Sequence, residues 1–303
     1  MAAISTGNHP KALWPGVQAW WGRQYRQYPE LYPGMFEVIS GSDKSYEEDV
    51  EVTGFGLAPS KSQGGGISYD SESQGETTRY THGAYALGYI VTHEELSDNL
   101  YPVVSKRRTT ALAFSMRQTI ETVAANVYNR ATNSSYTFGD SKEMLATDHP
   151  TSSGDQSNEL ATAADLSEAS LEDIVIQIRK AKNDRGLRIM LNPRRLVLPP
   201  DLEFEAHRIL KSVQQNDSAN NAINALRSSG AVPDGITINP FLTDTDQWFV
   251  KTDCPNSQKF IWRERPRIMQ DNDFGTMNAL TATYARFAVG STDWRGVYGS
   301  PGA

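Results

Sequence analysis

The longest regular pattern of apolar residues lies between Thr92 and Ala131. Its members recur at steps of three, four or eight residues, which keeps one face of an α-helix apolar. They are Leu96, Leu100, Val104, Leu112, Met116, Ile120, Val123 and Val127. Thr92 and Glu95 have the spacing of a capping box, which predicts a helix start at this point. Because Pro102 falls inside the pattern, we expect a break there and a continuous helix from about Val103 to Ala131.

This helix must organise much of the rest of the chain. At 1.5 Å per residue it is about 43 Å long, whereas a compact chain of 303 residues has a radius of gyration of only about 19 Å. The alternation over residues 277–289 predicts a long strand. One face of that strand carries Met277, Ala279, Thr281, Thr283, Ala285, Phe287 and Val289. We expect this face to pack against the long helix.

Residues 46–91 have the pattern of one extended β-hairpin. The first limb alternates apolar and polar residues and changes face at Gly54, which predicts a bulge. Residues 58–66 form a tip that is flexible by its glycine and serine content, and the return limb runs over residues 76–91. A hairpin with so few large apolar residues is not stable alone, so we expect it to gain burial from a neighbour.

Residues 1–45 have the character of an arm. The aromatic residues of this segment are interleaved with prolines, and only residues 17–28 have helical potential. The aromatic residues are Trp14, Trp20, Trp21, Tyr25, Tyr28, Tyr32 and Phe36. A surface is needed to cover them, and it belongs either to another part of this chain or to another copy.

A polar connector, residues 132–166, separates the long helix from an α/β unit. Ser170 and Asp173 have the spacing of a capping box, and Gly186 is placed to end the helix that follows. The predicted elements are a helix over 170–181, strands over 187–191, 196–198, 235–239, 248–251 and 259–262, a helix over 201–212, and a polar helix or loop over 216–227.

The charge of the chain is distributed in two blocks. The net charge of −7 argues against a nucleic-acid-binding protein that works through a basic surface. Residues 41–76 carry eight acidic residues against two lysines, and residues 101–131 carry five basic residues against one acidic residue. Two interpretations stay open: both blocks are solvated faces, or they meet across a subunit boundary. No segment approaches 18 consecutive apolar residues, so we expect no membrane span.

Candidate catalytic chemistry is sparse. The one cysteine, Cys254, has no histidine nearby in the sequence, which favours a loop or core cysteine over a nucleophile. Asp148 and His149 are the most enzyme-like pair, but neighbouring side chains point apart, so we expect a turn in which the aspartate caps local backbone. The five histidines are scattered, and no constellation emerges. We therefore expect no enzyme, no metal site and no cofactor.

The order of these parts resembles the major capsid proteins of tailed bacteriophages with the HK97-type fold, and within that group the Mu-like major head subunits. Three segments carry the resemblance: Leu87 to Glu95 ahead of the helix, Met144 to Pro150, and residues 186–202. The last is the most specific, because it joins a helix end, two strands and a helix start with the family's prolines in place.

The resemblance implies an α+β, HK97-like capsid fold. Its parts would be an N-terminal arm (1–45), an extended β-hairpin (46–91), a peripheral domain with the long spine helix and connector (92–166), an axial domain (167–255), and return strands of the peripheral domain (256–303). It also implies a function: copies of the chain self-assemble as hexamers and pentamers into an icosahedral shell around packaged double-stranded DNA. An encapsulin-type nanocompartment shell is the alternative.

The implied partners are further copies of this chain, a portal, and DNA enclosed without sequence-specific binding. Scaffolding, if used, is expected to be a separate protein, and decoration proteins stay open. Localisation would be the virion capsid, after assembly in the host cytoplasm. Some family members link a hairpin lysine to a neighbour's asparagine, for which Lys61 and Asn278 are the candidates here.

The candidate contacts between subunits follow from the arm and the charge blocks. We expect the acidic hairpin to lie partly on the basic surface of an adjacent subunit and to steer its closure. The candidate residues are Trp14, Trp20, Trp21, Glu47, Glu48, Asp49, Lys61, Arg107, Arg108 and Arg117.

Overall fold

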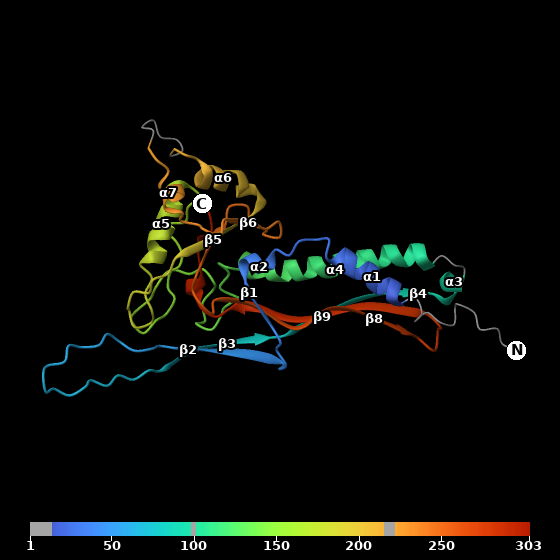
Figure 1. Cartoon of the computed structure of the whole chain (residues 1–303), viewed down its shortest axis with the longest axis horizontal. Helices are drawn as coiled ribbons and strands as arrows, with labels where there is room; N and C mark the ends of the chain where they lie inside the picture. The colour runs from blue at the N-terminus through green and yellow to red at the C-terminus, as the bar shows by residue number, and fades with distance from the viewer. Residues whose placement is uncertain (1–13, 98–100, 215–221) are drawn as a thin grey trace.

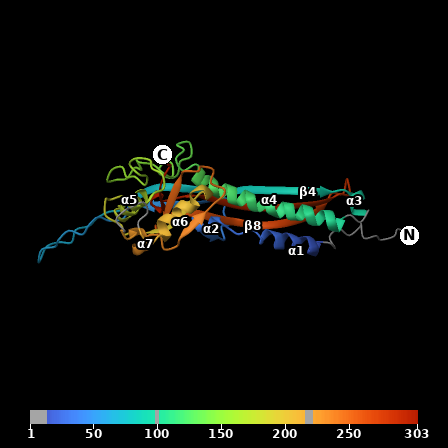
Figure 2. The same ribbon diagram turned by 90° about the horizontal axis from the view of Figure 1, so that it is seen from above.

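The computed structural model of the chain describes residues 14–97, 101–214 and 222–303. The molecule has three visible parts (Figure 1). A long helix lies along an elongated sheet, a compact unit stands at one end of that sheet, and a thin hairpin extends away from the body. Figure 2 shows the same helix from above, following the length of the sheet.

The elongated sheet has the strand order β1-β8-β9-β4. Its strands are β1 (Glu37–Ser40), β8 (Gln258–Asn272), β9 (Ala279–Ser291) and β4 (Gly83–Val91). β1 is parallel to β8, and the other pairs are antiparallel. The alternation predicted for the last long strand is confirmed in β9, where Ala279 and every second residue to Phe287 are buried. Met277 lies before the strand and is exposed, so its predicted place on this face was wrong.

The long helix is α4 (Tyr101–Asn129), and a short helix, α3 (His93–Ser97), precedes it. Pro102 therefore lies in the first turn of α4, where a missing N–H costs no helical hydrogen bond. The helix ends two residues before the predicted Ala131. Thr92 Oγ1 accepts a hydrogen bond from the Glu95 backbone N–H at 3.3 Å, which confirms a cap at the start of α3.

The N-terminal segment is part of the subunit core and not only an arm. α1 (Trp14–Tyr25) packs on α4, and α2 (Tyr32–Met35) leads into β1. Tyr32 and Phe36 are buried together with Tyr128 of α4 and Phe260 of β8. The aromatic residues from Tyr32 to Phe36 are thus covered by this chain itself.

The hairpin is shorter than predicted. It consists of β2 (Tyr46–Val52) and β3 (Gln74–Thr81), whose ladder is interrupted between Val50 and Val52 and not at Gly54. After His82, the chain leaves the hairpin and continues as β4 beside β9. The predicted return limb over residues 76–91 is therefore two strands in two different sheets.

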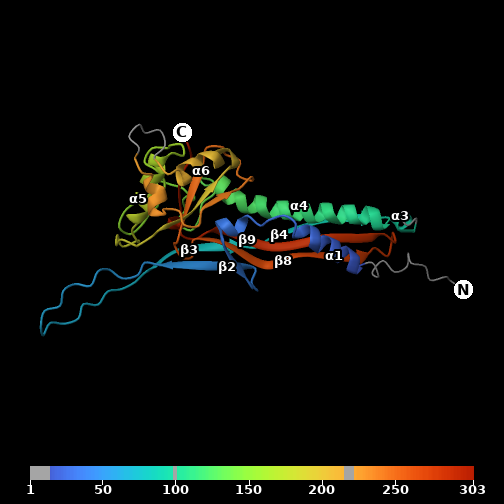
Figure 3. The ribbon, with the colours of Figure 1, turned by 45° about the horizontal axis from the view of Figure 1, so that its top comes forward.

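The compact unit is built on a second sheet with the order β10-β7-β5-β6. Its strands are β10 (Val297–Ser300), β7 (Trp248–Thr252), β5 (Pro193–Leu198) and β6 (Ile236–Ile238), with helices α5 (Glu168–Arg179), α6 (Glu203–Lys211) and α7 (Ala225–Ser229) and the short 3-10 helices η3 (Pro200–Leu202) and η4 (Trp294–Gly296). The final strand β10 returns to this sheet, although we expected the C-terminal strands to lie with the long helix. Figure 3 shows the compact unit above one end of the long sheet.

Three local predictions for this unit need correction. Ser167, and not Ser170, is the N-cap of α5. Its side chain accepts a hydrogen bond from the Ser170 backbone N–H, and the Ser170 side chain accepts one from the Ser167 backbone N–H. Residues 187–191 form no strand and contribute only the isolated bridge between Lys182 and Arg188. The predicted strand 259–262 is the first part of β8 in the long sheet. Of the predicted helix or loop 216–227, the residues up to 221 lie outside the described part of the chain.

Candidate assembly surfaces

The base of the hairpin is held to its own subunit by ion pairs. The Asp49 carboxylate lies 2.6 Å from the Lys259 ammonium of β8, and it accepts a hydrogen bond of 2.7 Å from Thr292 Oγ1. The Lys259 side chain is only 7% exposed, so this pair is largely screened from solvent. Asp49 thus anchors the hairpin within the chain.

The neighbouring acidic residues also have local partners. Glu48 and Arg79 face each other across the hairpin and form an ion pair of 2.6 Å. Glu47 accepts a hydrogen bond of 2.7 Å from Ser42 Oγ and pairs with Lys44 at 3.7 Å. Much of the acidic block is therefore neutralised inside the subunit, which the count of charges in the sequence did not reveal.

The tip of the hairpin has a different character. Residues 53–73 belong to no strand, and four large apolar side chains stand exposed there: Phe55 (58%), Leu57 (81%), Ile67 (69%) and Tyr69 (91%). Lys61 is exposed between them. Asp70 accepts a hydrogen bond from the Gly56 N–H at 2.8 Å, which joins the two limbs. The backbone N–H groups of Gly56 and Ser71 lower the pKa of Asp70, and Arg185 of the compact unit lowers it further.

Arg117 does not belong to an exposed basic surface. Its guanidinium pairs with Glu30 at 2.9 Å, donates a hydrogen bond of 3.0 Å to the Tyr28 carbonyl, and lies 4.9 Å from the centre of the Tyr25 ring. The buried Glu121 accepts hydrogen bonds from two backbone N–H groups of the same segment. Arg117 therefore secures the N-terminal segment to α4 within the subunit.

Arg107 and Arg108 lie nearer the start of α4. Arg108 pairs with Glu95 of α3 at 3.0 Å. Arg107 and the adjacent Lys106 are exposed, and within the described residues neither has an ion-pair partner. This pair of cations is therefore available to bind a carboxylate of another molecule. Both side chains lie on the solvent side of α4, since Ser105 and Thr109, which contact the Tyr89 hydroxyl of β4, lie on the opposite face of the helix.

The tryptophans of the N-terminal segment divide into three cases. Trp21 is 8% exposed and stacks on Tyr25 with 4.8 Å between ring centres. Trp20 is partly buried in the same cluster, against α4 and the long sheet. Trp14 begins α1, and its side chain lies outside the described part of the chain. Trp21 is thus covered by its own subunit, without a neighbour.

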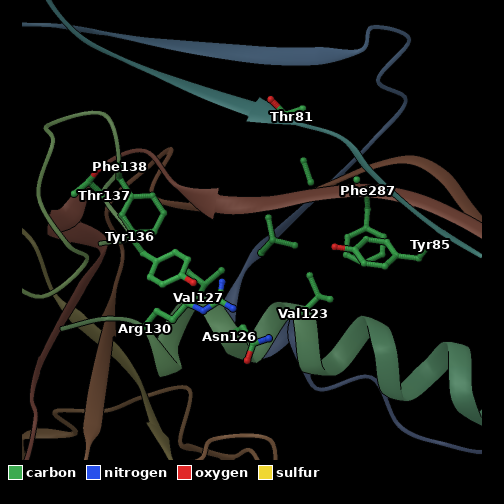
Figure 4. Close-up of a pocket in the computed structure, with 13 residues that line it drawn as sticks. Thr81, Tyr85, Val123, Asn126, Val127, Arg130, Tyr136, Thr137, Phe138 and Phe287 are labelled. Carbon is green, nitrogen blue, oxygen red and sulfur yellow. The ribbon is translucent and has the colours of Figure 1, made fainter. Parts of the chain in front are cut away.

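A cavity of about 300 Å³ opens between α4, the start of β4, β9 and the connector. The rings of Tyr85 and Phe287 stack on one side of it at 4.8 Å (Figure 4). On the other side, the Arg130 guanidinium lies 4.1 Å from the centre of the Tyr136 ring. Its walls combine aromatic rings with the polar side chains of Asn126 and Arg130. The sequence did not predict it, because its walls come from segments far apart along the chain.

The enzyme-like residues do not converge. Asp148 pairs with Lys142, whereas the fully buried His149 contacts Asp140 at 2.6 Å and Asn158 at 3.0 Å and stacks on Trp294. The turn expected at these two residues was wrong: His149 forms an isolated antiparallel bridge with Gln156, and the Asp148 carboxylate binds the Lys142 side chain instead of capping backbone. Burial, followed by the charge of Asp293, raises the pKa of the Cys254 thiol above its usual range. These groups serve packing and ion pairing.

Two further observations concern sites of other kinds. In the residues that the structure describes, no group of three or more histidine, cysteine, aspartate or glutamate side chains is arranged to hold a metal ion. Over the same residues, no helix has the length and apolar character needed to cross a bilayer.

Several solved structures share the fold of this chain. The capsid of a native GTA particle aligns with a TM-score of 0.56 at 10% identity, over 90% of each chain. A virus-like particle from Pyrococcus furiosus has a TM-score of 0.52 at 9% identity, over 94% of this chain and 97% of that one. The capsid of Myoviridae phage XM1 has a TM-score of 0.51 at 10% identity, over 91% and 93%. These similarities confirm the α+β, HK97-like fold.

Sequence comparison identifies the family. A search of curated proteins found no match. The family model described as phage capsid protein matches residues 75–300, from the hairpin through to the last strand. The closer resemblance to Mu-like head subunits is not tested by these matches and stays a prediction. The match covers about three quarters of the chain, and the chain belongs to the phage capsid protein family.

Proposed function

We propose that copies of this capsid protein close into an icosahedral shell of hexamers and pentamers, and that the hairpin tip joins each copy to the next. The exposed tip is the observation that carries this proposal. Four large apolar side chains lie on a segment without a strand partner, and the tip extends away from the body (Figure 1). Monomeric proteins rarely leave such a surface uncovered.

The surface that receives the tip would follow β4. This edge strand has the sequence GAYALGYIV, without a charged residue, and its Leu87 and Ile90 are about half exposed. An uncharged edge strand is a template for pairing with another chain. The cavity at Tyr85 lies at its first end, and the segment of α4 that carries Lys106 and Arg107 on its solvent side lies near its last. The apolar tip would bind along the strand, and an exposed acidic residue such as Glu72 would approach Arg107.

The division into domains follows the same proposal. Residues 1–45 would be the arm, 46–91 the extended hairpin region, 92–166 and 256–303 the peripheral domain, and 167–255 the axial domain that meets its copies at capsomer centres. Since β10 completes the sheet of the compact unit, we assign this last strand to the axial domain. Trp14 and Trp20 stay candidates for contact with a neighbour.

The proposed content of the shell is double-stranded phage DNA, held without sequence-specific contacts. A net charge of −7 suits a container that later releases its genome. We propose assembly in the host cytoplasm, a portal, no enzymatic role, and separate scaffolding or decoration proteins if any are used. An encapsulin-type shell with protein cargo is the alternative function, but the family match gives it no added support.

Electron microscopy of the full-length chain expressed alone tests the shell directly. Closed particles of uniform size are the expected result, and a monomer at high protein concentration would contradict self-assembly. For particles taken from infected cells, nuclease-protected double-stranded DNA supports the phage head, whereas protein cargo without DNA supports the alternative. Denaturing electrophoresis of the same particles tests the Lys61–Asn278 link: a ladder supports it, and a single band excludes it.

A further inference from the structure

Arg295 lies at the junction of the three parts of the molecule. This η4 residue is 3% exposed, and its guanidinium contacts three carboxylates: Asp184 at 2.6 Å, Asp293 at 3.3 Å and Glu51 at 3.5 Å. Its Nε also donates a hydrogen bond of 2.8 Å to the Lys182 carbonyl. The cation thereby connects backbone and side chains that are far apart in the sequence.

The three carboxylates come from three separate segments of the chain. Glu51 is on β2 of the hairpin, Asp184 is in the loop that follows α5 of the compact unit, and Asp293 immediately precedes η4. The position of the hairpin relative to the compact unit therefore depends on this cluster, in addition to the exposed Asp70–Arg185 pair. Glu51 makes the longest of the three contacts, so it is the member least firmly bound to Arg295.

The charges in the cluster do not balance. One guanidinium cannot neutralise three carboxylates in a site with little solvent, and one of the acids holds a proton more readily than it would in water. Burial is the main cause that raises the pKa of Glu51, followed by Asp293 and Asp184, and the result is a pKa of about 7 despite the opposing effect of Arg295. When protonated, Glu51 can donate a hydrogen bond to Asp184.

Other titratable groups surround the same site. The Cys254 thiol donates a hydrogen bond to Asp293 at 3.3 Å. A cavity of about 210 Å³ beside Glu51 is also lined by Glu76 of β3 and Asp140 of the connector. Both of these groups are acidic, and neither supplies the missing positive charge. The cavity gives water access to Glu51, whose side chain is 31% exposed.

We propose that Glu51, Asp184, Asp293 and Arg295 form a proton-controlled latch that fixes the base of the hairpin to the compact unit. With Glu51 protonated, the cluster carries one excess negative charge, and the hairpin is held. Loss of the proton leaves two excess negative charges around one cation, and the repulsion favours release of β2. This inference concerns the hairpin within one subunit and does not depend on the shell proposed above.

The direction of the pH dependence follows from linkage. The pKa of Glu51 is raised from 4.5 to about 7 in the latched state, so protonation favours that state. The added stability of the latch is complete below pH 4.5. It is lost progressively as the pH rises to about 7, and it does not change further above that.

Hydrogen exchange of the full-length chain tests the latch. In Glu51→Gln the side chain is permanently neutral and can still donate a hydrogen bond to Asp184. At pH 7.5, backbone amides of β2 and β3 should exchange at least about tenfold more slowly in this variant than in the wild type, because one pKa unit corresponds to a factor of ten. At pH 4.5 the two proteins should exchange equally. Comparison at equal pH cancels the intrinsic effect of pH on exchange.

Two further variants control the experiment. Glu72→Gln removes an exposed carboxylate of the hairpin outside the cluster and should show no difference that depends on pH. Asp184→Asn removes one excess charge, so the change in hairpin protection between pH 4.5 and 7.5 should be smaller than in the wild type. Equal protection of Glu51→Gln and wild type at both pH values would overturn the proposal, and so would a difference of the same size at both.

Discussion

The guanidinium of Arg117 and the carboxylate of Glu30 form an ion pair of 2.9 Å that joins the middle of α4 to the segment between α1 and α2. The Arg117 side chain is 3% exposed, and its hydrogen bond to the Tyr28 carbonyl fixes the same segment a second time. The pair therefore helps to determine where the N-terminal segment enters the core, immediately before the buried Tyr32 and Phe36.

Replacing Arg117 by alanine should lower the free energy of unfolding by about 2–3 kcal/mol. The variant leaves the buried Glu121 without the nearby positive charge and removes the donor to the Tyr28 carbonyl. Chemical denaturation of the full-length chain measures the change. Arg108→Ala is the matched control, because its pair with Glu95 is partly exposed and is worth only about 0.2–1 kcal/mol. Equal losses in the two variants would contradict the role given to Arg117.

Polar substitution of the hairpin tip should block assembly and leave the subunit folded. The triple variant Phe55→Ser, Leu57→Ser, Tyr69→Ser removes apolar area that is exposed in the subunit, so its unfolding midpoint should stay close to that of the wild type. Sedimentation and electron microscopy should show a loss of particles. Phe204→Ser, at an exposed position on the compact unit, is the control for polarity alone, and particles should form normally.

A charge exchange tests the proposed contact between Arg107 and the tip. Arg107→Glu should reduce the yield of particles, because it places a negative charge where the acidic tip approaches. Adding Glu72→Arg should restore part of the yield if the two residues meet in the shell. Arg179→Glu changes the net charge equally at an exposed position of α5 and serves as the control. Rescue of Arg179→Glu by Glu72→Arg to the same extent would show that only the net charge matters.

His149 should prove structural. Its ring nitrogens face Asp140 and Asn158, so His149→Phe keeps the stacking on Trp294 but removes both polar contacts. We expect a loss of about 2 kcal/mol in the free energy of unfolding. Asp148→Asn, on the exposed neighbour, should leave the unfolding midpoint unchanged. A stable His149→Phe protein would show that these contacts contribute little.

The elements that the sequence predicted best are those whose apolar pattern repeats over many residues. The helical repeat over the 29 residues of α4 and the alternation along β9 can each be recognised from that segment alone. The boundary at His82 was missed for the opposite reason. β3 and β4 alternate in the same way, and only the choice of β2 or β9 as partner separates a hairpin limb from a strand of the long sheet.

The partners of the charged residues also could not be predicted from the sequence. Counting charges found the acidic and basic blocks, but it could not pair Asp49 with Lys259 or Glu51 with Arg295, because these partners are more than 200 residues apart. Arg117 and Arg107 lie on one helix and have the same charge. They differ in burial: Arg117 is buried and anchors the N-terminal segment, whereas Arg107 is exposed and is a candidate contact with a neighbouring subunit.

The contact between Asp70 and Arg185 has a mechanical consequence. The hairpin is fixed at its base to the long sheet, and this second contact, 3.4 Å long, fixes its outer half to the loop after α5. Because the hairpin is held at these two points by different parts of the subunit, rotation of the compact unit relative to the long sheet displaces the tip. In a closed shell, a change of tilt in one subunit would then move the subunit that its hairpin touches, and curvature would be set jointly by neighbours.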